Sequence, residues 1–306
     1  MLVAILGIFI GIGLPIQTAV NIKLKTAAKS PFISSFLSFT IGGIALLLIT
    51  NITRPKINSV IITQQPWWLW IGGLLGALFL TSNILLLPKI GSFQTVLMPI
   101  IGQIIMSIVI DNWGLFDSRR IPFNFFGIVG VTIVLIGAGV TIYPGNQHYA
   151  HVAKRKENYI FKIIGIITGM FSAIQTAING HLGIVYGSSL FAATLSFIVG
   201  WICLLGIVII TDRTTILVLQ LSNFRQLPMW SWLGGLIGAS FVLGNVVMMP
   251  ILGAGLSTTI ILGGQLLGSV CLSYLGWFDI QKTAITRAEI IGIILIVLGI
   301  LIIKLF

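Results

Sequence analysis

The stretch Gln17-Thr18-Ala19-Val20-Asn21 returns 158 positions later as Gln175-Thr176-Ala177-Ile178-Asn179. After an insertion of four residues the match continues at a distance of 162 positions, and its polar members are Asn83, Gln103 and Asp117, which recur as Asn245, Gln265 and Asp279. Apolar matches could arise from composition, but amides and carboxylates in register cannot easily do so. We therefore expect an internal repeat, with a first unit at 1–145, a polar linker at 146–158 and a second unit at 159–306.

The composition predicts a protein that is surrounded by lipid. Of 306 residues 57% are hydrophobic and 8% are charged, and the mean hydropathy is +1.11. A soluble domain carries about 25% charged residues, which this chain could not supply to its surface. The net charge of +11 comes from basic residues in the gaps between apolar runs, which is typical of topology determinants. We expect no nucleic-acid partner.

Ten apolar segments are long enough to cross a bilayer, for which a helix needs roughly 20 residues. The expected spans are 2–22, 33–50, 68–87, 92–111, 122–142, 160–178, 191–211, 231–249, 255–275 and 287–305. Each repeat thus holds five spans, and because five is odd the two units must enter the membrane in opposite directions. The predicted fold is an all-α integral membrane protein of ten transmembrane helices, built as two inverted five-helix repeats. Inverted repeats are a recurrent architecture of transporters, although a duplication could also produce a larger bundle and nothing more.

The distribution of Lys and Arg predicts an orientation. The loops after the odd-numbered spans hold 12 of these residues, whereas the other side, with both termini, holds 5. By the positive-inside rule both termini lie outside the cell membrane and the central linker is cytoplasmic.

A neutral polar set supplies the candidate solute-binding residues: Gln17, Asn21, Asn83, Gln103, Gln175, Asn179, Asn245 and Gln265. Gln17 and Asn21 are four residues apart and share a helix face, as their repeats do. An amide in hydrocarbon needs a partner, so these residues either line a hydrated cavity or hydrogen-bond between helices. We favour the cavity for the Gln17 and Gln175 pairs and leave both possibilities open for the other four.

Charged residues are absent from the middle of every expected span, so a proton site is most easily placed at Asp111, at the end of the fourth span. Asp117 and Asp279 are expected to cap helices or to pair with Arg119, Arg120 and Lys282. Pairs of glycines four residues apart, such as Gly72 and Gly76, predict close approach of helix backbones. Pro15 and Pro99 predict kinks in the first unit. His148 and His151 lack further ligands, and no metal site is expected.

Several of these segments, together with Ser30-Pro31-Phe32, Ser38-Phe39-Thr40-Ile41-Gly42 and Gly114-Leu115-Phe116-Asp117, resemble the YdcZ-like branch of the drug/metabolite transporter superfamily. The resemblance covers nearly the whole chain twice, so the sequence looks like a fused two-unit form. It implies a transporter without a named substrate. It also implies termini inside the cell, as is usual in the wider superfamily, in conflict with the charge distribution.

These observations predict a secondary transporter or facilitator of a small neutral, zwitterionic or organic-cationic solute that works by alternating access. We expect no enzyme activity and no cofactor, and because the chain lacks a phosphate-binding loop, ATP does not drive it directly. The lipid bilayer and the solute are the expected partners. Because one chain contains both repeats, we expect that it can function as a monomer. The alternatives are a membrane-embedded enzyme that acts on a lipid-linked substrate and a non-transporting partner subunit.

Overall fold

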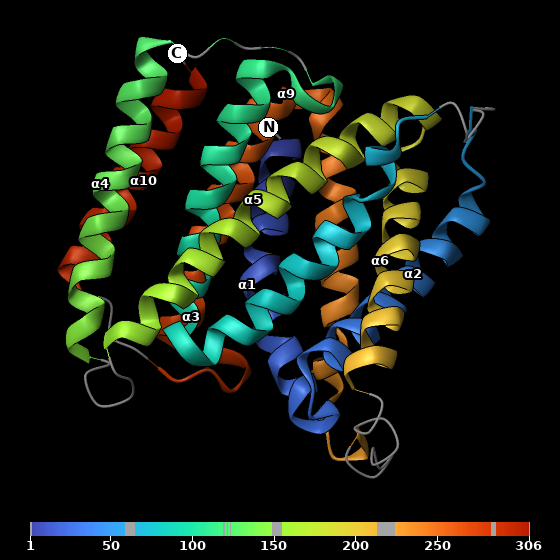
Figure 1. The fold of residues 1–306 in the computed structure, drawn as a ribbon, viewed down its shortest axis with the longest axis horizontal. Coiled ribbons are helices and arrows are strands. Elements are labelled where there is room, and N and C mark those ends of the chain that lie inside the picture. The colour runs from blue at the N-terminus through green and yellow to red at the C-terminus, as the bar shows by residue number, and fades with distance from the viewer. Residues whose placement is uncertain are drawn as a thin grey trace.

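The computed structural model describes residues 2–58, 65–118, 120, 122, 124–148, 155–212, 224–282 and 286–305. Within these ranges the regular structure is helical (Figure 1). The helices are α1 (Leu2–Ala28), α2 (Pro31–Thr53), α3 (Gly72–Trp113), α4 (Phe125–His148), α5 (Arg155–Tyr186), α6 (Ser189–Thr211), α9 (Gly234–Leu275) and α10 (Arg287–Leu305). Short 3-10 turns lie at Trp67–Trp70 (η2), Leu115–Asp117 (η3), Met229–Trp232 (η4) and Trp277–Asp279 (η5).

Five of the described helices are long and apolar enough to cross a membrane, and three further apolar helices are shorter. Helix α3 has 42 residues and would be about 63 Å long if straight, twice the thickness of a bilayer core. It is broken at Gly91, whose φ of 80° and ψ of 166° are non-helical. The expected spans 68–87 and 92–111 are therefore two arms of one helical run. Pro15 lies inside α1 and Pro99 inside the second arm of α3, and the non-helical backbone of α3 lies at Gly91.

Helix α9 has the same length as α3. We call Gly234–Met248 its first arm and residues 257–275 its second arm. Helix α4 extends to His148 and α5 begins at Arg155, so both ends of the linker expected at 146–158 are helical. His151 lies outside the described residues, as do 149–154 in general.

Each helix packs mainly on a helix of the other repeat. The principal pairs are α1 with α9, α3 with α5, α4 with α10 and α2 with α6. Figure 1 shows α4 and α10 side by side at the left of the molecule, apart from the remaining helices. In this pair Gly137 faces the carbonyl of Gly292 and Gly299 faces the carbonyl of Gly130, so the two helices run antiparallel. The two repeats are thus interdigitated and do not form separate domains.

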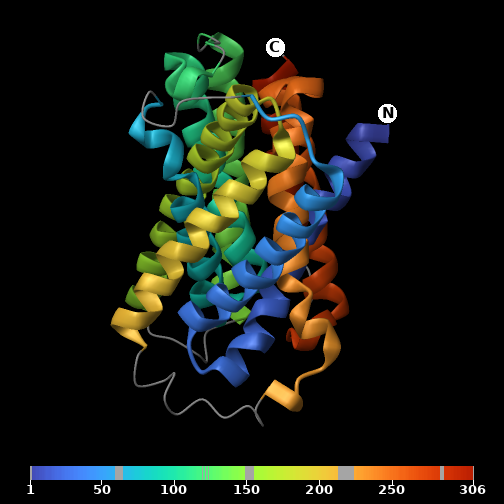
Figure 2. The same cartoon turned by 90° about the vertical axis from the view of Figure 1, so that its right-hand side faces the viewer.

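The molecule has two ends, which we name after one aspartate at each. Asp117 of η3 follows α3 and lies near the end of α5, because His181 Nε2 is 3.4 Å from its Oδ2. Asp279 of η5 follows α9 and lies near the end of α1, where Lys23 Nζ is 2.6 Å from its Oδ2. We call these the Asp117 end and the Asp279 end, and they lie at the top and the bottom of Figure 1. Figure 2 shows both termini at one end of the molecule.

These two contacts differ from the expectation that Asp117 and Asp279 pair with neighbouring loop residues such as Arg120 and Lys282. Arg119, which was also expected as a partner, lies outside the described residues.

Phe116 and Phe278, which precede the two aspartates, have φ values of 57° and 56°, in the left-handed region. The chain therefore turns back after each helix and presents the aspartate to a helix of the other repeat. Lys23 and His181 are themselves counterparts in the repeat, 158 positions apart, so the two contacts are equivalent.

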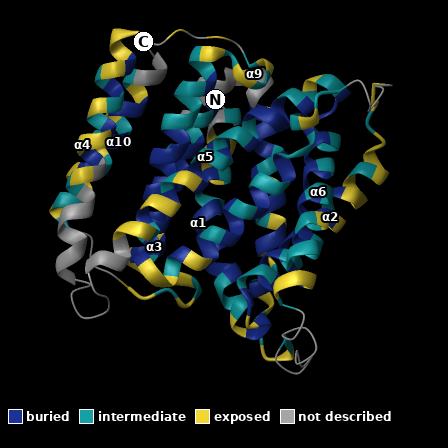
Figure 3. Cartoon of the chain, viewed as in Figure 1, coloured by how far each residue is buried: buried dark blue, intermediate teal, exposed yellow. Residues whose placement is uncertain are grey.

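Burial follows the pattern of a helical bundle in lipid. Buried residues gather where α1, α3, α5, α6 and α9 meet, and exposed ones face outward (Figure 3). Large aliphatic side chains make up much of the outer surface; Ile52 and Ile210, for example, are 80% and 83% exposed. Soluble monomers rarely expose wide apolar patches, so this surface fits a hydrocarbon surrounding.

Candidate functional site

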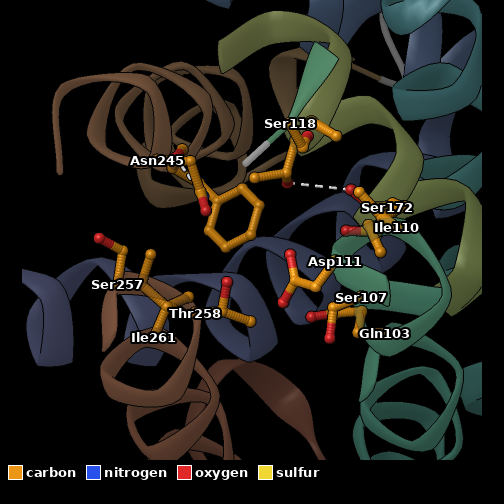
Figure 4. A pocket seen from close by; sticks show the side chains of 14 residues that line it. Gln103, Ser107, Ile110, Asp111, Ser118, Ser172, Asn245, Ser257, Thr258 and Ile261 are labelled. Atoms are coloured by element: carbon orange, nitrogen blue, oxygen red, sulfur yellow. Dashed lines mark hydrogen bonds between the residues drawn. The ribbon is translucent and has the colours of Figure 1, made fainter. Parts of the chain in front are cut away.

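A pocket opens at the Asp117 end, between the second arm of α3, the middle of α5 and both arms of α9 (Figure 4). Its space amounts to about 670 Å³ when the open mouth is included. Nine of its fourteen lining residues have polar side chains, and the lining residues are Gln103, Ser107, Ile110, Asp111, Ser118, Ser172, Ala173, Thr176, Ala177, Phe241, Asn245, Ser257, Thr258 and Ile261.

Five of the candidate residues predicted from the sequence lie at this pocket or next to it. Gln103, Asn245 and Asp111 line the pocket itself. Gln175 and Asn179 line a smaller adjoining space of about 190 Å³, which shares Thr176, Phe241 and Asn245 with the larger one. Four of the eight predicted amides are therefore brought together in one region.

The other four amides are the repeat counterparts of these, and they lie in the closed interior. Gln265 corresponds to Gln103 and is 1% exposed, and neither atom of its amide has a hydrogen-bond partner among the described residues. Asn21 is completely buried, and Gln17 and Asn83 are buried as well. The structure thus brings four of the predicted amides to a pocket, whereas their four counterparts are buried and line neither of these two spaces.

A serine pair closes the Asp279 end. Ser92, at the start of the second arm of α3, and Ser273, near the end of α9, share a hydrogen bond of 2.6 Å between their hydroxyl oxygens, and both are buried. Further along, Leu97 and Ile101 of α3 belong to the same apolar cluster as Leu262 and Leu266 of α9. The two arms are therefore in contact at the Asp279 end and in the middle, and separate only where the pocket opens. Ser273 is the counterpart of Asp111, 162 positions earlier.

The predicted glutamine and asparagine pairs pack on glycines. A Cβ at Gly234 or Gly238 of α9 would overlap the amides of Asn21 and Gln17. In the other repeat the amides of Asn179 and Gln175 occupy the same place over two glycines of α3, Gly72 and Gly76. At these glycine pairs the neighbouring helix contributes amide side chains and not its backbone, which corrects the expectation of backbone contact.

Helix backbones come into close contact at the glycines that follow Gly72 and Gly234, and at Gly11 of α1. A Cβ at Gly73 would meet the carbonyl of Ser196, and one at Gly235 would meet that of Ser38. Gly11 lies equally close to the carbonyl of Ile261. In each of these places two helices of different repeats touch, because glycine has no side chain to separate them.

Three buried polar atoms of the pocket region have no hydrogen-bond partner among the described residues: Nε2 of Gln103, Oγ of Ser257 and Oδ1 of Asn179. Buried polar groups are normally paired, so these atoms can bind a solute or water without losing an existing bond. Asn245 donates from Nδ2 to the carbonyl of Phe241 at 2.8 Å, which leaves its side-chain oxygen as an acceptor. The wall thus contains both hydrogen-bond donors and hydrogen-bond acceptors.

Several pocket residues were not predicted. Ser172 and Ser257 have Leu14 and Thr95 as counterparts, so the repeat gave no sign of them. Thr176 belongs to the repeated stretch and could have been included with Gln175. No group of three or more metal-ligating side chains occurs among the described residues.

The fold defines a helical, multi-pass membrane protein, and it has a pocket lined by both polar and apolar side chains at one end. Comparison with known families then identifies it: the family model described as "Putative inner membrane exporter, YdcZ" matches residues 2–140 and again residues 160–302. The chain belongs to this family of membrane transporters, in a fused form with two units.

Individual relatives agree with this assignment. Inner membrane protein YdcZ from Escherichia coli (strain K12) is 25% identical over 131 residues, which cover 42% of this chain and 86% of that protein. A solved structure described only as the crystal structure of a protein has a TM-score of 0.63 at 17% identity, and the match covers 99% of this chain and 96% of that one. At this identity the second match concerns the fold alone.

Proposed function

We propose that the protein is a secondary transporter or facilitator that moves a small neutral, zwitterionic or organic-cationic solute by alternating access. One observation carries the proposal: a polar pocket is open at the Asp117 end, while the equivalent position at the Asp279 end is sealed by Ser92 and Ser273. Two equivalent halves in different states are what a transporter with inverted repeats requires, since an exchange of their conformations moves the opening to the other side.

The arrangement in the membrane is part of the same proposal. Ten spans result if each arm of α3 and α9 crosses once, with repeat units at 1–145 and 159–306 joined by a linker at 146–158. The antiparallel contact of α4 with α10 supports opposite insertion of the two units. The charge distribution favours termini outside the cell and a cytoplasmic linker.

The solute would meet Gln103, Asn245 and Ser257 in the pocket, with Gln175 and Asn179 in the adjoining space. After the exchange of conformations, the equivalent wall would be formed by Gln265, Asn83, Gln17 and Asn21. On this account both groups of amides bind solute, each in its own state, and both also hold helices together.

The test is uptake of a panel of small solutes into proteoliposomes, with and without a pH gradient. Gln103→Leu and Gln265→Leu should both lower uptake, although only Gln103 lines the pocket in the present structure. Asn51→Leu, on the exposed surface of α2, serves as the control and should leave uptake unchanged. If Gln103→Leu abolished uptake while Gln265→Leu had no effect, the pocket would be a fixed site and alternating access would be contradicted.

A further inference from the structure

A lysine is buried near the start of α5. Lys162 is 6% exposed, and lysines are rarely buried to this extent unless an anion neutralises them. It lies three residues before Gly165, which faces Met98 of α3, so it shares the helix face that packs on α3. Its Nζ is 5.4 Å from the ring centroid of Tyr159, which is 52% exposed. The ammonium group is therefore directed toward the first turns of α5, at the Asp279 end.

Two more lysines, from two other helices, lie at the same place. Lys89 lies two residues before the break of α3 at Gly91. Its Nζ is 5.6 Å from the ring centroid of Phe161, which is the neighbour of Lys162 in the sequence. Lys25, in the last turn of α1, is close enough to Lys89 for their charges to repel. Figure 1 shows the end of α1, the break of α3 and the start of α5 at the bottom of the molecule, so three helices bring three positive charges together there.

The carboxylates that the structure describes at this end have other partners. Asp279 pairs with Lys23, with 2.6 Å between Oδ2 and Nζ. Asp212 accepts a hydrogen bond of 2.6 Å at Oδ2 from the hydroxyl of Ser30. Glu289 accepts hydrogen bonds from the residue that caps the start of α10. Within the described part of the chain, the three clustered lysines therefore form no ion pair.

The cluster belongs to one end of the molecule only. The counterparts of Lys25, Lys89 and Lys162 in the other repeat are Gly183, Ile251 and Ala4. A structural role in the scaffold that the repeats share would require lysines at both ends. A topology signal needs basic residues only in loops, whereas Lys162 is packed inside the bundle. The arrangement is instead what a binding site for an anion on one side of the membrane requires.

We propose that Lys25, Lys89 and Lys162 bind the phosphate group of an anionic phospholipid in the leaflet at the Asp279 end. A phosphate accepts charge-assisted hydrogen bonds from several ammonium groups at once, and such bonds are stronger than neutral ones. The charge distribution of the sequence favours a cytoplasmic position for this end, and basic pockets between helices on that side are suited to anionic headgroups. The pocket opens at the opposite end, so this site is separate from it and does not depend on the proposed transport function.

The experiment counts the lipid molecules that the intact chain retains. The protein is equilibrated in mixed micelles that hold equal amounts of phosphatidylglycerol and phosphatidylcholine, and native mass spectrometry gives the ratio of the two lipids that stay bound. The parent protein should prefer phosphatidylglycerol. Lys89→Gln and Lys162→Gln should each lower this preference about fivefold, because each removes one positive charge from the headgroup site. Lys89→Arg keeps the charge and should keep the preference.

Lys282→Gln is the matched control, because it removes the same charge from an exposed position at the same end and should leave the ratio unchanged. An equal loss in this control would indicate a general attraction to basic surface and would overturn the proposal. An unchanged ratio in Lys89→Gln would also overturn it, and because Lys89 is exposed this variant tests the site even if Lys162→Gln folds poorly. Displacement of the lipid by an excess of inorganic phosphate would assign the site to a free anion and would contradict the assignment to a lipid.

Discussion

Phe39 of α2 and Phe197 of α6 stack on one another, with ring centroids 4.7 Å apart and an angle of 28° between the ring planes. They are also counterparts in the repeat, 158 positions apart. A residue that meets its own counterpart lies next to the axis that relates the two halves. The surrounding contacts agree, because Gly42 lies against Phe197 and Gly200 lies against Phe39.

Aromatic contacts farther from this axis occur twice, once at each end of the molecule. Trp68 and Phe116 are in edge contact at 5.4 Å between centroids, and Trp230 and Phe278 repeat the contact at 5.2 Å. Equivalent contacts at both ends indicate that the scaffold is nearly symmetric. The difference between the ends is concentrated at the arms of α3 and α9, where one end is sealed and the other is hollow.

The first prediction concerns the backbone contact of α3 with α6. In Gly73→Ala the new Cβ would overlap the carbonyl of Ser196, which cannot move independently of its helix. We expect a loss of about 1–3 kcal/mol in the free energy of unfolding, the usual cost of overpacking. Gly206→Ala on α6 is the matched control, because no atom lies within 4 Å of its Cβ. Unfolding of both variants in mixed micelles measures the difference, and equal stabilities would contradict the described contact.

The second prediction concerns the fit of an amide over a glycine. Gly76→Ala should destabilise the protein because the Cβ overlaps the amide of Gln175, and Gln175→Ala should remove that overlap. The double variant should therefore be more stable than the sum of the single changes predicts, by about 0.5–3 kcal/mol. The same cycle with Gly238 and Gln17 should give a similar coupling. Strict additivity in both cycles would show that these pairs do not touch.

The third prediction concerns the ion pair of Lys23 with Asp279, whose side chains are 31% and 62% exposed. Exposed ion pairs contribute little, so Asp279→Asn should change the free energy of unfolding by less than about 1 kcal/mol. Adding Lys23→Gln should cause no further loss. A loss well above this value would mean that the contact at this end, and not the apolar packing, holds α1 to α9.

The sequence predicted much of this fold because its decisive signals are local. The length of each apolar segment indicates where a helix lies. The amides and carboxylates that match between the two halves of the sequence reveal the repeat. The break of α3 at Gly91 was not predicted, since a single glycine among many gives no distinct signal. The pairing of Lys23 with Asp279 was also missed, because it joins residues 256 positions apart and depends on how the repeats interdigitate.

The site could be predicted only as a set of equivalent residues. Gln103 and Gln265 are the same residue type in the same local sequence, so nothing near either one indicates which of them lies at an open pocket. The exceptions are positions where the repeat departs from itself, such as Asp111 with Ser273 and Ser92 with Ala254. Of these, Asp111 was noticed from the sequence as a possible proton site at a span end, and that role stays a prediction.

Alternating access itself is tested most directly by the reactivity of two equivalent positions. Ser107→Cys lies in the pocket wall, and Ser269→Cys is its buried counterpart at the sealed end, each in a background with Cys203 and Cys271 replaced by alanine. Ser92→Ala removes the hydrogen bond to Ser273 and introduces the residue type found at the counterpart position, Ala254. The loss of about 1 kcal/mol from the sealed end should shift the balance of states several-fold.

The measurement is the rate of maleimide labelling at each reporter, with and without Ser92→Ala. The account predicts that the change raises labelling of Ser269→Cys and lowers labelling of Ser107→Cys, because one end opens as the other closes. An increase at both positions, or an increase at Ser269→Cys with no change at Ser107→Cys, would contradict alternating access and would show that the two ends open independently.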